Sequence, residues 1–333
     1  IYKIDDKIYL GHPGTKVLPE LPENLIEKPT LAWLYQNQSK SAHELQVSYL
    51  ANNIGWKADY VITLGSKDDE MDLAGWVTVD NQSGTSYRNA KLKLVAGDVN
   101  RVTSAQPRKM MRMEMAMAMD AGAAFASEQF FEYHIYDLKR PTTIKDRQTK
   151  QIRFIEALGI KTEKEYVVQA QGHYFGPMSH GTKPKIPVNV YMRFDNKASN
   201  QLGEPLPAGI MRIYKEDRQG SLQFVGEDRI THTPKDEEVR LKMGNAFDVV
   251  EERRQLGYHR LTSNMHESEW EVVIRNHKSE AITVFVDESL SGSWKLTKHS
   301  HDYEKQDAFK IRFTVNVPAD GETKITYTVR TGV

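Results

Sequence analysis

The stretch from Trp270 to Val286, WEVVIRNHKSEAITVFV, determines the fold class of this chain. Apolar and polar residues alternate on both sides of Asn276. Such alternation gives a β-strand one apolar and one polar face, so the stretch predicts two half-buried strands joined by a turn. Asn276 suits the turn, because an Asn side chain bonds nearby backbone amides and the residue tolerates positive φ.

The same alternation recurs along the chain, and extended amphipathic helical patterns are hard to find. The clearest further runs are ELQVSYL from Glu44, GWVTVDN from Gly75, AKLKLV from Ala90 and FKIRFTVNV from Phe309. We therefore predict an all-β protein with little helix.

Two internal repeats are visible. Three other alternating runs also end at an Asn followed by a polar turn, and these residues are Asn37, Asn81 and Asn196. We interpret all four as turn residues rather than ligands. In the second repeat, FEYHIYDLKRPTTIKDRQTKQIRF from Phe131 resembles FKIRFTVNVPADGETKITYTV from Phe309. In both, an aromatic-led strand reaches a proline, a polar turn and another strand.

These repeats predict tandem immunoglobulin-like β-sandwich modules. The first module covers residues 1–160 with its lead-in strands, and the second covers residues 161–333. If the repeats are equivalent, the segments that follow Trp76 and Trp270 form matching hairpins, with the two tryptophans at or near equivalent positions.

A Met/Ala-rich insertion, residues 101–129, interrupts the first module. It contains KMMRMEMAMAMDAGAAF, Lys109–Phe125, with six of the twelve methionines. The alternating ones, which would share one face of an extended chain, are Met111, Met113, Met115, Met117 and Met119. Thioethers select Cu(I), so a Cu(I)-binding protein using segment 110–119 is one alternative function. Because the run holds no His or Cys, a flexible or docked apolar arm is the favoured interpretation.

Composition excludes several functions. Lys plus Arg and Asp plus Glu are both 45, and like charges form no block, so a nucleic-acid partner is not expected. The chain has no Cys, which excludes disulfides, thiolate nucleophiles and zinc–thiolate or iron–sulfur sites. No apolar run approaches the length of a transmembrane helix.

The histidines offer a weak candidate metal site. His299 and His301 are two apart, so on a strand both imidazoles would face one side. A third ligand would have to come from Asp302, His259 or His266. Two such ligands alone are a weak signal, and a surface turn is the simpler interpretation.

Neighbouring carboxylates offer a candidate glycosidase pair, in Glu227–Asp228 and in Asp236–Glu238. Adjacent strand residues point to opposite faces, so a charged strand edge is the better interpretation. The sequence has no nucleophile elbow, phosphate-binding loop or dinucleotide fingerprint. An uncharacterised hydrolase remains the second alternative.

The tryptophans either line a carbohydrate groove or pack in cores, and strand context favours packing. They are Trp33, Trp56, Trp76, Trp270 and Trp294. Trp56 and Tyr60 share a strand face that continues through Ile62 and Leu64, so we expect this face in the first core.

Two long segments carry a family resemblance. They are HELQVSYLANNIGWKADYVITL from His43 and DLAGWVTVDNQSGTSYRNAKLKLVAGDVNRV from Asp72. Together with YHIYDL, PLPAGIMRIYKED and GEDRITHTPKDEEVRLKMGNAFDV, they make the chain resemble a bacterial family catalogued as domain of unknown function 4139. That family is related to the C-terminal half of mucoidy-inhibitor-A-like proteins, and the resemblance covers about residues 43–329.

The resemblance implies an exported or envelope-associated protein, mainly of β-strands, without established activity or catalytic residues. Many members begin with a strand domain and a coiled coil, which are absent here. The start IYKIDDKIYL, with no leader, therefore fits a processed or truncated chain.

We predict a non-enzymatic structural or interaction protein of the cell envelope, periplasmic or extracellular. It needs no cofactor and binds a protein or cell-surface partner through its sandwich modules. A homo-oligomer formed through sheet edges or the Met-rich arm is compatible with this reading.

Overall fold

The structure is a computed structural model that describes residues 2–4, 7–9, 30, 32–38, 41–97, 125–130, 132–171, 185–290 and 292–332. Their regular secondary structure consists of β-strands, apart from one short 3₁₀ helix, η1 (Ala198–Asn200). The prediction of an all-β protein with little helix is confirmed.

A five-stranded sheet forms the first sandwich together with smaller sheets. Its strand order is β10 (Gln148–Lys161), β4 (Glu70–Asn81), β3 (Ile54–Leu64), β13 (Gly209–Glu216) and β14 (Leu222–Ile230). Only the β3–β13 pair is parallel. The smaller sheets are β6 (Lys93–Ala96), β8 (Tyr133–Leu138) and β7 (Phe125–Phe130), then β5 (Tyr87–Ala90) with β9 (Thr142–Ile144). A separate hairpin pairs β1 (Tyr2–Ile4) with β2 (Lys7–Tyr9).

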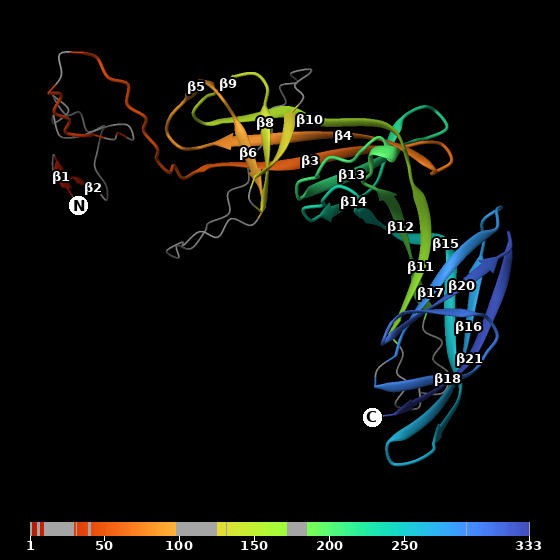
Figure 1. Ribbon diagram of the computed structural model, residues 1–333. Coiled ribbons are helices and arrows are strands. Elements are labelled where there is room, and N and C mark those ends of the chain that lie inside the picture. The colour runs from red at the N-terminus through yellow and green to blue at the C-terminus, as the bar shows by residue number, and fades with distance from the viewer. Residues whose placement is uncertain are drawn as a thin grey trace.

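A nine-stranded sheet runs from the first sandwich into the second. Its first strands are β18 (Ser293–His299), β21 (Gly321–Gly332), β16 (Met265–Asn276) and β15 (Glu238–Arg260). The others are β12 (Lys185–Asp195), β11 (Glu163–Gln171), β17 (Ile282–Ser289), β20 (Lys310–Val317) and β19 (Tyr303–Asp307). Figure 1 shows two bodies at an angle, with β11, β12 and β15 passing between them.

Each body has its own apolar core. Tyr60 of β3 is fully buried in the first core, and its hydroxyl donates a 2.8 Å hydrogen bond to the Pro207 carbonyl. Trp270 of β16 is buried in the second core, between the layer containing β15, β16 and β21 and the layer containing β17 and β20. The alternation in the sequence therefore produces two layers of strands with apolar side chains between them.

Long strands belong to both cores. The end of β12 contributes Phe194 to the first core, and its beginning contributes Val188 to the second. In the same way β15 contributes Leu241 to the first core and Val249 to the second. The predicted division into residues 1–160 and 161–333 does not describe these cores, because residues 192–241 return to the first sandwich.

Asn81, Asn196 and Asn276 form the same turn in three units of the fold. Each is fully buried at the end of a strand, and its side-chain Nδ2 donates to two carbonyls. One carbonyl lies shortly after the Asn, and the other lies 64, 38 and 42 residues further along the chain. Those distant carbonyls belong to Lys145, Pro234 and Pro318.

The turn that supplies the distant carbonyl is also shared. Two residues after the carbonyl, each unit has a residue with positive φ, namely Arg147 (54°), Asp236 (66°) and Asp320 (44°). The strand that follows pairs with the strand that ends at the Asn. The internal repeat therefore occurs three times in the described part of the chain.

The prediction of matching hairpins after Trp76 and Trp270 is wrong. After Asn81 and Asn276 the chain crosses to the opposite layer, where β6 pairs with β8 and β17 pairs with β20. The two tryptophans are also one position out of step, because Trp270 is six residues before its Asn and Trp76 is five before its own. A shift of one residue moves a side chain to the other face, so Trp270 is in the core and Trp76 is not.

The run ELQVSYL from Glu44 was expected to be a strand, but residues 42–50 belong to none. Leu45, Val47 and Tyr49 are exposed by 63%, 48% and 58%. Alternation alone does not make a strand when no neighbouring strand is paired with it.

Candidate functional site at the junction of the two sandwiches

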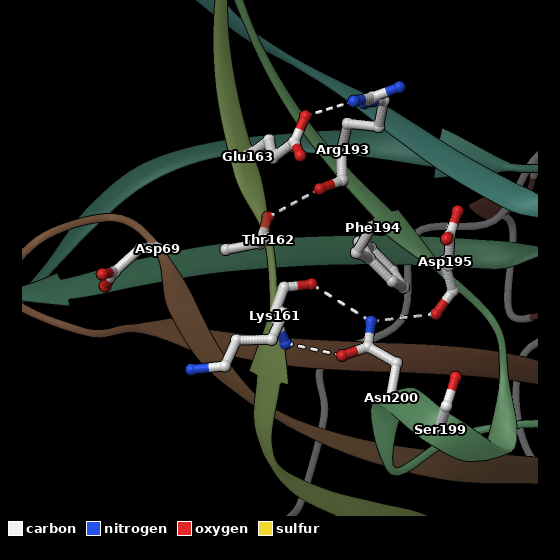
Figure 2. A pocket seen from close by; sticks show the side chains of 9 residues that line it. All are labelled: Asp69, Lys161, Thr162, Glu163, Arg193, Phe194, Asp195, Ser199 and Asn200. Atoms are coloured by element: carbon white, nitrogen blue, oxygen red, sulfur yellow. Dashed lines mark hydrogen bonds and ion pairs between the residues drawn. The ribbon is translucent and has the colours of Figure 1, made fainter.

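Thr162 separates β10 of the first sandwich from β11, which enters the second. Its backbone N–H donates to the Asp69 carbonyl at 3.0 Å. Its hydroxyl donates to the Arg193 carbonyl at 2.9 Å (Figure 2). Hydrogen bonds from both sides therefore fix the chain at the point where it changes from one sandwich to the other.

Asn200 binds the main chain of Lys161, the residue that precedes Thr162. The Lys161 N–H donates to its Oδ1 at 2.7 Å, and its Nδ2 donates to the carbonyls of Lys161 and Asp195 at 3.1 Å. Figure 2 shows Asn200, at the end of η1, reaching between the two main chains. The η1 turn after Asn196 therefore connects β12 with β10.

Asp68, in the turn between β3 and β4, binds two lysines from different strands. Its carboxylate accepts a 2.6 Å bond from Lys164 of β11 and a short bond from Lys215 of β13. Burial alone would raise the pKa of Asp68, but the hydrogen bonds from the two lysines outweigh it and hold the pKa below its usual value. The β3–β4 turn is thereby joined electrostatically to the strand that leads into the second sandwich.

Arg193 and Arg240 form a second group of charges beside this turn. Arg193 of β12 pairs with Glu163, and it also contacts Glu238 at 3.1 Å and Glu165 at 3.5 Å. Arg240 of β15 donates to Glu165 at 2.9 Å and lies 3.8 Å above the ring centroid of Tyr191. These contacts tie β11, β12 and β15 together where they cross between the bodies.

The junction carries a polar pocket of about 420 Å³. It is lined by Asp69, Lys161, Thr162, Glu163, Arg193, Phe194, Asp195, Ser199 and Asn200 (Figure 2). Lys161 pairs with Glu70 and Arg193 with Glu163, so these charges are already neutralised within the protein. The arrangement is suited to fixing the angle between the sandwiches.

A buried ionic triad lies inside the second sandwich. Arg253 of β15 donates to Glu251 Oε1 at 3.1 Å and, through both terminal nitrogens, to Glu288 of β17 at 2.7 and 3.2 Å. Glu251 and Glu288 are fully buried, and Glu251 Oε2 has no hydrogen-bond partner. Burial raises the pKa of Glu251 to about 7, although Arg253 opposes this.

The candidate histidines lie at the end of β18 and in the turn after it. His299 Nδ1 is 2.9 Å from the His301 carbonyl, and His301 Nδ1 is 2.9 Å from the Ser300 hydroxyl. His266 instead lies against the hydroxyl of Tyr258 at 2.7 Å. Within the described ranges, no group of three or more His, Cys, Asp or Glu side chains is arranged to hold a metal ion.

The candidate acid pair of β14 separates onto different neighbours. Glu227 pairs with Arg212 of β13 at 3.2 Å, whereas Asp228 accepts from the Lys242 backbone N–H of β15 at 2.7 Å. In the other candidate set, Asp236 occupies the positive-φ turn position and Glu238 pairs with Arg193. The carboxylates in each set bind different neighbours, and in neither set do two of them face each other as a glycosidase pair would.

The tryptophans divide between packing and exposure. Trp270 is in the second core, where its indole N–H donates to Ser268 at 3.1 Å. Trp56 and Trp294 are partly buried against the first and second cores. Trp76 is half-buried, and Trp33 is 64% exposed. The five alternating methionines, Met111 to Met119, lie outside the described residues.

Sequence reasoning missed the residues that join the bodies, chiefly Asp68, Thr162 and Asn200. Their partners are far away in sequence, so no local pattern identifies them. The buried triad could have been suspected from the sequence, because Glu251 and Arg253 occupy inward positions of an alternating strand where apolar residues are usual.

The fold and its junction define an all-β protein in which sandwich units share long strands and paired charges hold those strands in place. Among the described residues, no helix is long and apolar enough to cross a membrane. The chain belongs to the family described as Domain of unknown function (DUF4139), whose model matches residues 45–331. No curated protein and no solved structure matches the chain.

Proposed function

We propose that the chain is a non-enzymatic structural or interaction protein of the cell envelope, periplasmic or extracellular, that binds another protein through exposed strand-forming residues. The envelope location rests on the family resemblance. The binding role rests on the segment that precedes β3, which we call the exposed segment, residues 32–38 and 41–50.

One observation carries the binding role. The exposed segment has the alternation of a half-buried strand, yet its apolar side chains are in water, as Leu45, Val47 and Tyr49 show. Removing apolar surface from water favours association, and an extended chain binds a strand edge through its main-chain hydrogen bonds. The segment therefore has what a strand-addition partner requires.

The junction supports the structural part of the proposal. Paired charges at Asp68, Arg193 and Arg240 connect three strands between the sandwiches. Such a connection suits a protein that presents binding surfaces in a fixed relative position.

The test is photo-crosslinking in cells of the source organism. A photoreactive amino acid at Tyr49 is expected to give a discrete crosslinked species, identified by mass spectrometry. The matched control is the same group at Gln219, an exposed turn residue of the first sandwich. Absence of any species specific to position 49 contradicts the binding role.

A further inference from the structure

A pocket of about 520 Å³ lies at one end of the first sandwich, where the chain enters β3, and we call it the end pocket. Ser83 and Thr85 of the turn after β4 form one wall together with Tyr87 of β5. The segment 49–52, directly before β3, forms the other wall, and Thr30 completes the lining. Both walls belong to the end of the sandwich that carries β5 and β9 (Figure 1). Small-molecule sites have volumes of about 300–1,000 Å³, so the end pocket is large enough for such a ligand.

The lining of the end pocket is polar but uncharged. Of its eight residues, five carry a hydroxyl and one, Asn52, carries an amide, whereas Leu50 and Ala51 are apolar. The junction pocket, in contrast, is lined by five charged residues. A charged ligand would lose its hydration in the end pocket without gaining an opposite charge. The lining therefore suits a neutral ligand that carries hydroxyl groups.

Two tyrosines supply aromatic surface, one on each wall. The ring of Tyr87 packs against the first core, and its hydroxyl donates to the Ser83 hydroxyl oxygen at 3.3 Å. Tyr49 is 58% exposed, so much of its ring is accessible. A tyrosine combines an apolar ring with a polar end, and a hydroxyl that donates one hydrogen bond still has lone pairs to accept others. A sugar has the matching chemistry, because its C–H faces are apolar and its edge carries hydroxyl groups.

The walls of the end pocket are held by hydrogen bonds within the protein. The buried Asn81 side-chain oxygen accepts from the Ser83 N–H at 3.1 Å and from the Ser83 hydroxyl at 2.7 Å. The Gln82 N–H donates to the Asn53 carbonyl at 2.7 Å. This last bond joins the two walls, because Asn53 directly follows the segment 49–52. A site with fixed walls loses little conformational entropy when a ligand binds.

We propose that the end pocket binds a neutral saccharide. Tyr49 supplies a ring face against which the sugar packs, and Tyr87, Ser83 and Asn52 exchange hydrogen bonds with its hydroxyl groups. This inference goes beyond the proposed function, because it concerns a carbohydrate ligand and does not depend on strand addition. A short saccharide and the chain of a polysaccharide present the same chemistry, so both are tested.

The test compares neutral and acidic sugars of equal length as ligands of the full chain. The probes are an array of oligosaccharides of glucose, galactose, mannose, xylose and N-acetylglucosamine, with oligosaccharides of glucuronic and galacturonic acid as the charged set. Electrophoresis in gels that contain the corresponding polysaccharides tests the polymers. We expect the chain to bind at least one neutral sugar and to bind the acidic sugars more weakly. Binding on the array identifies a short saccharide as sufficient, whereas retardation by a polymer alone identifies a polysaccharide ligand.

Two variants connect the binding to the end pocket. Tyr49→Ala is expected to weaken binding about tenfold, because the sugar loses a ring face. Tyr87→Phe keeps the packed ring and removes one hydroxyl, so we expect a loss of about two- to tenfold. The matched control is Tyr35→Ala, which removes the same side chain at a position that is also 58% exposed but does not line the pocket. It is expected to bind like the unaltered chain.

The inference is overturned if the unaltered chain binds no neutral sugar, if it prefers the acidic set, or if Tyr49→Ala binds as tightly as Tyr35→Ala. Photo-crosslinking from position 49 separates this failure from that of the proposed function. A chain that binds no sugar but crosslinks to a protein contradicts the saccharide site alone. A chain that binds a neutral sugar and gives no crosslink contradicts the protein-binding role alone.

Discussion

The side-chain amide of Asn276 donates a 2.9 Å hydrogen bond to the carbonyl of Pro318, 42 residues further along the chain. A second bond of 2.8 Å reaches the Glu280 carbonyl, and the Asn276 Oδ1 accepts from Lys278 N–H at 3.0 Å. One buried side chain thus connects the end of β16, the turn after it and the turn between β20 (Lys310–Val317) and β21 (Gly321–Gly332). Asn81 and Asn196 do the same in their own units.

Asn276→Ala is expected to lower the free energy of unfolding by about 2–4 kcal/mol, because buried carbonyls and an N–H lose their partner. Asn276→Asp is expected to cost more, since a carboxylate would face the carbonyls of Glu280 and Pro318. The control is Asn264→Ala at an exposed turn position, with an expected change within about 0.5 kcal/mol. Denaturant unfolding measures all three, and an Asn276→Ala variant as stable as the control contradicts the role.

The buried triad makes stability depend on pH. The pKa of Glu251 is raised from an ordinary 4.5 to about 7, so its carboxyl holds a proton more tightly in the folded chain than in the unfolded chain. The folded state is therefore favoured at low pH, and this contribution is lost as pH rises from 4.5 to about 7. Glu251→Gln is expected to raise stability above pH 7 by about 1–3 kcal/mol and to flatten this part of the profile.

The control for this prediction is Glu288→Gln, which weakens the two hydrogen bonds from Arg253 and removes the negative charge that faces its guanidinium. It is expected to destabilise the chain by about 3–5 kcal/mol. Thermal unfolding across a pH series distinguishes the two variants. Equal destabilisation by both would show that Glu251 is ionised in the folded protein at neutral pH.

Alternation is a local property, so it predicted most strands and their inward faces; the run from Glu44 and the face position of Trp56 are exceptions. The sequence also identified the Asn turns, which combine a local bond with a strand end. It did not reveal that the chain crosses between layers after Asn81, since a crossing and a hairpin use similar turn residues. The contacts of Asp68 and Asn200 at the junction could not be predicted either, because they join residues that are far apart in the sequence. Their partners, Lys164, Lys215 and Lys161, are brought together only by the completed sheets.

Asp68 provides a test of the junction. Its pKa lies below the ordinary 3.8, so the ion pairs stabilise the folded chain above that pH, and the contribution is lost as pH falls through the lower value. Asp68→Asn is expected to cost about 1–2 kcal/mol at neutral pH. Asn accepts the positive φ of 60° at this position, so the substitution changes charge and hydrogen bonding without straining the backbone.

The same variant is expected to widen the distribution of angles between the bodies, because Lys164 and Lys215 lose their common carboxylate. Distances between spin labels at the exposed positions Arg88 and Ser263, introduced as the only two Cys residues, report this angle. Asp302→Asn, at an exposed position, is the matched control. A distance distribution identical to that of the control would show that the hydrogen bonds of Thr162 and Asn200 suffice.

Tyr60 and Trp56 share a face of β3 but differ in burial. Tyr60 is fully buried and Trp56 only partly, which departs from the expectation that the whole face lies in the core. Tyr60→Ala is therefore expected to cost about 3–5 kcal/mol, and Trp56→Ala about 1–2 kcal/mol. Tyr60→Phe isolates the bond to the Pro207 carbonyl and is expected to cost about 1 kcal/mol. Equal losses for the two Ala variants, by denaturant unfolding, would contradict this ranking.

The Met-rich stretch Lys109–Phe125 allows a direct test of copper binding. Five alternating thioethers offer soft ligands for Cu(I), but the run holds no His or Cys to strengthen a site. Methionine is also an adaptable apolar side chain, which suits an arm that docks on a protein surface. We therefore expect a Cu(I) competition titration to give the same affinity for the full chain and for a chain lacking residues 109–125. As a control, a chain in which Met111, Met113, Met115, Met117 and Met119 are all replaced by Leu keeps the apolar character and removes the thioethers. Binding tighter than micromolar that disappears in both the deletion and the Leu variant would establish a copper site and overturn the arm interpretation.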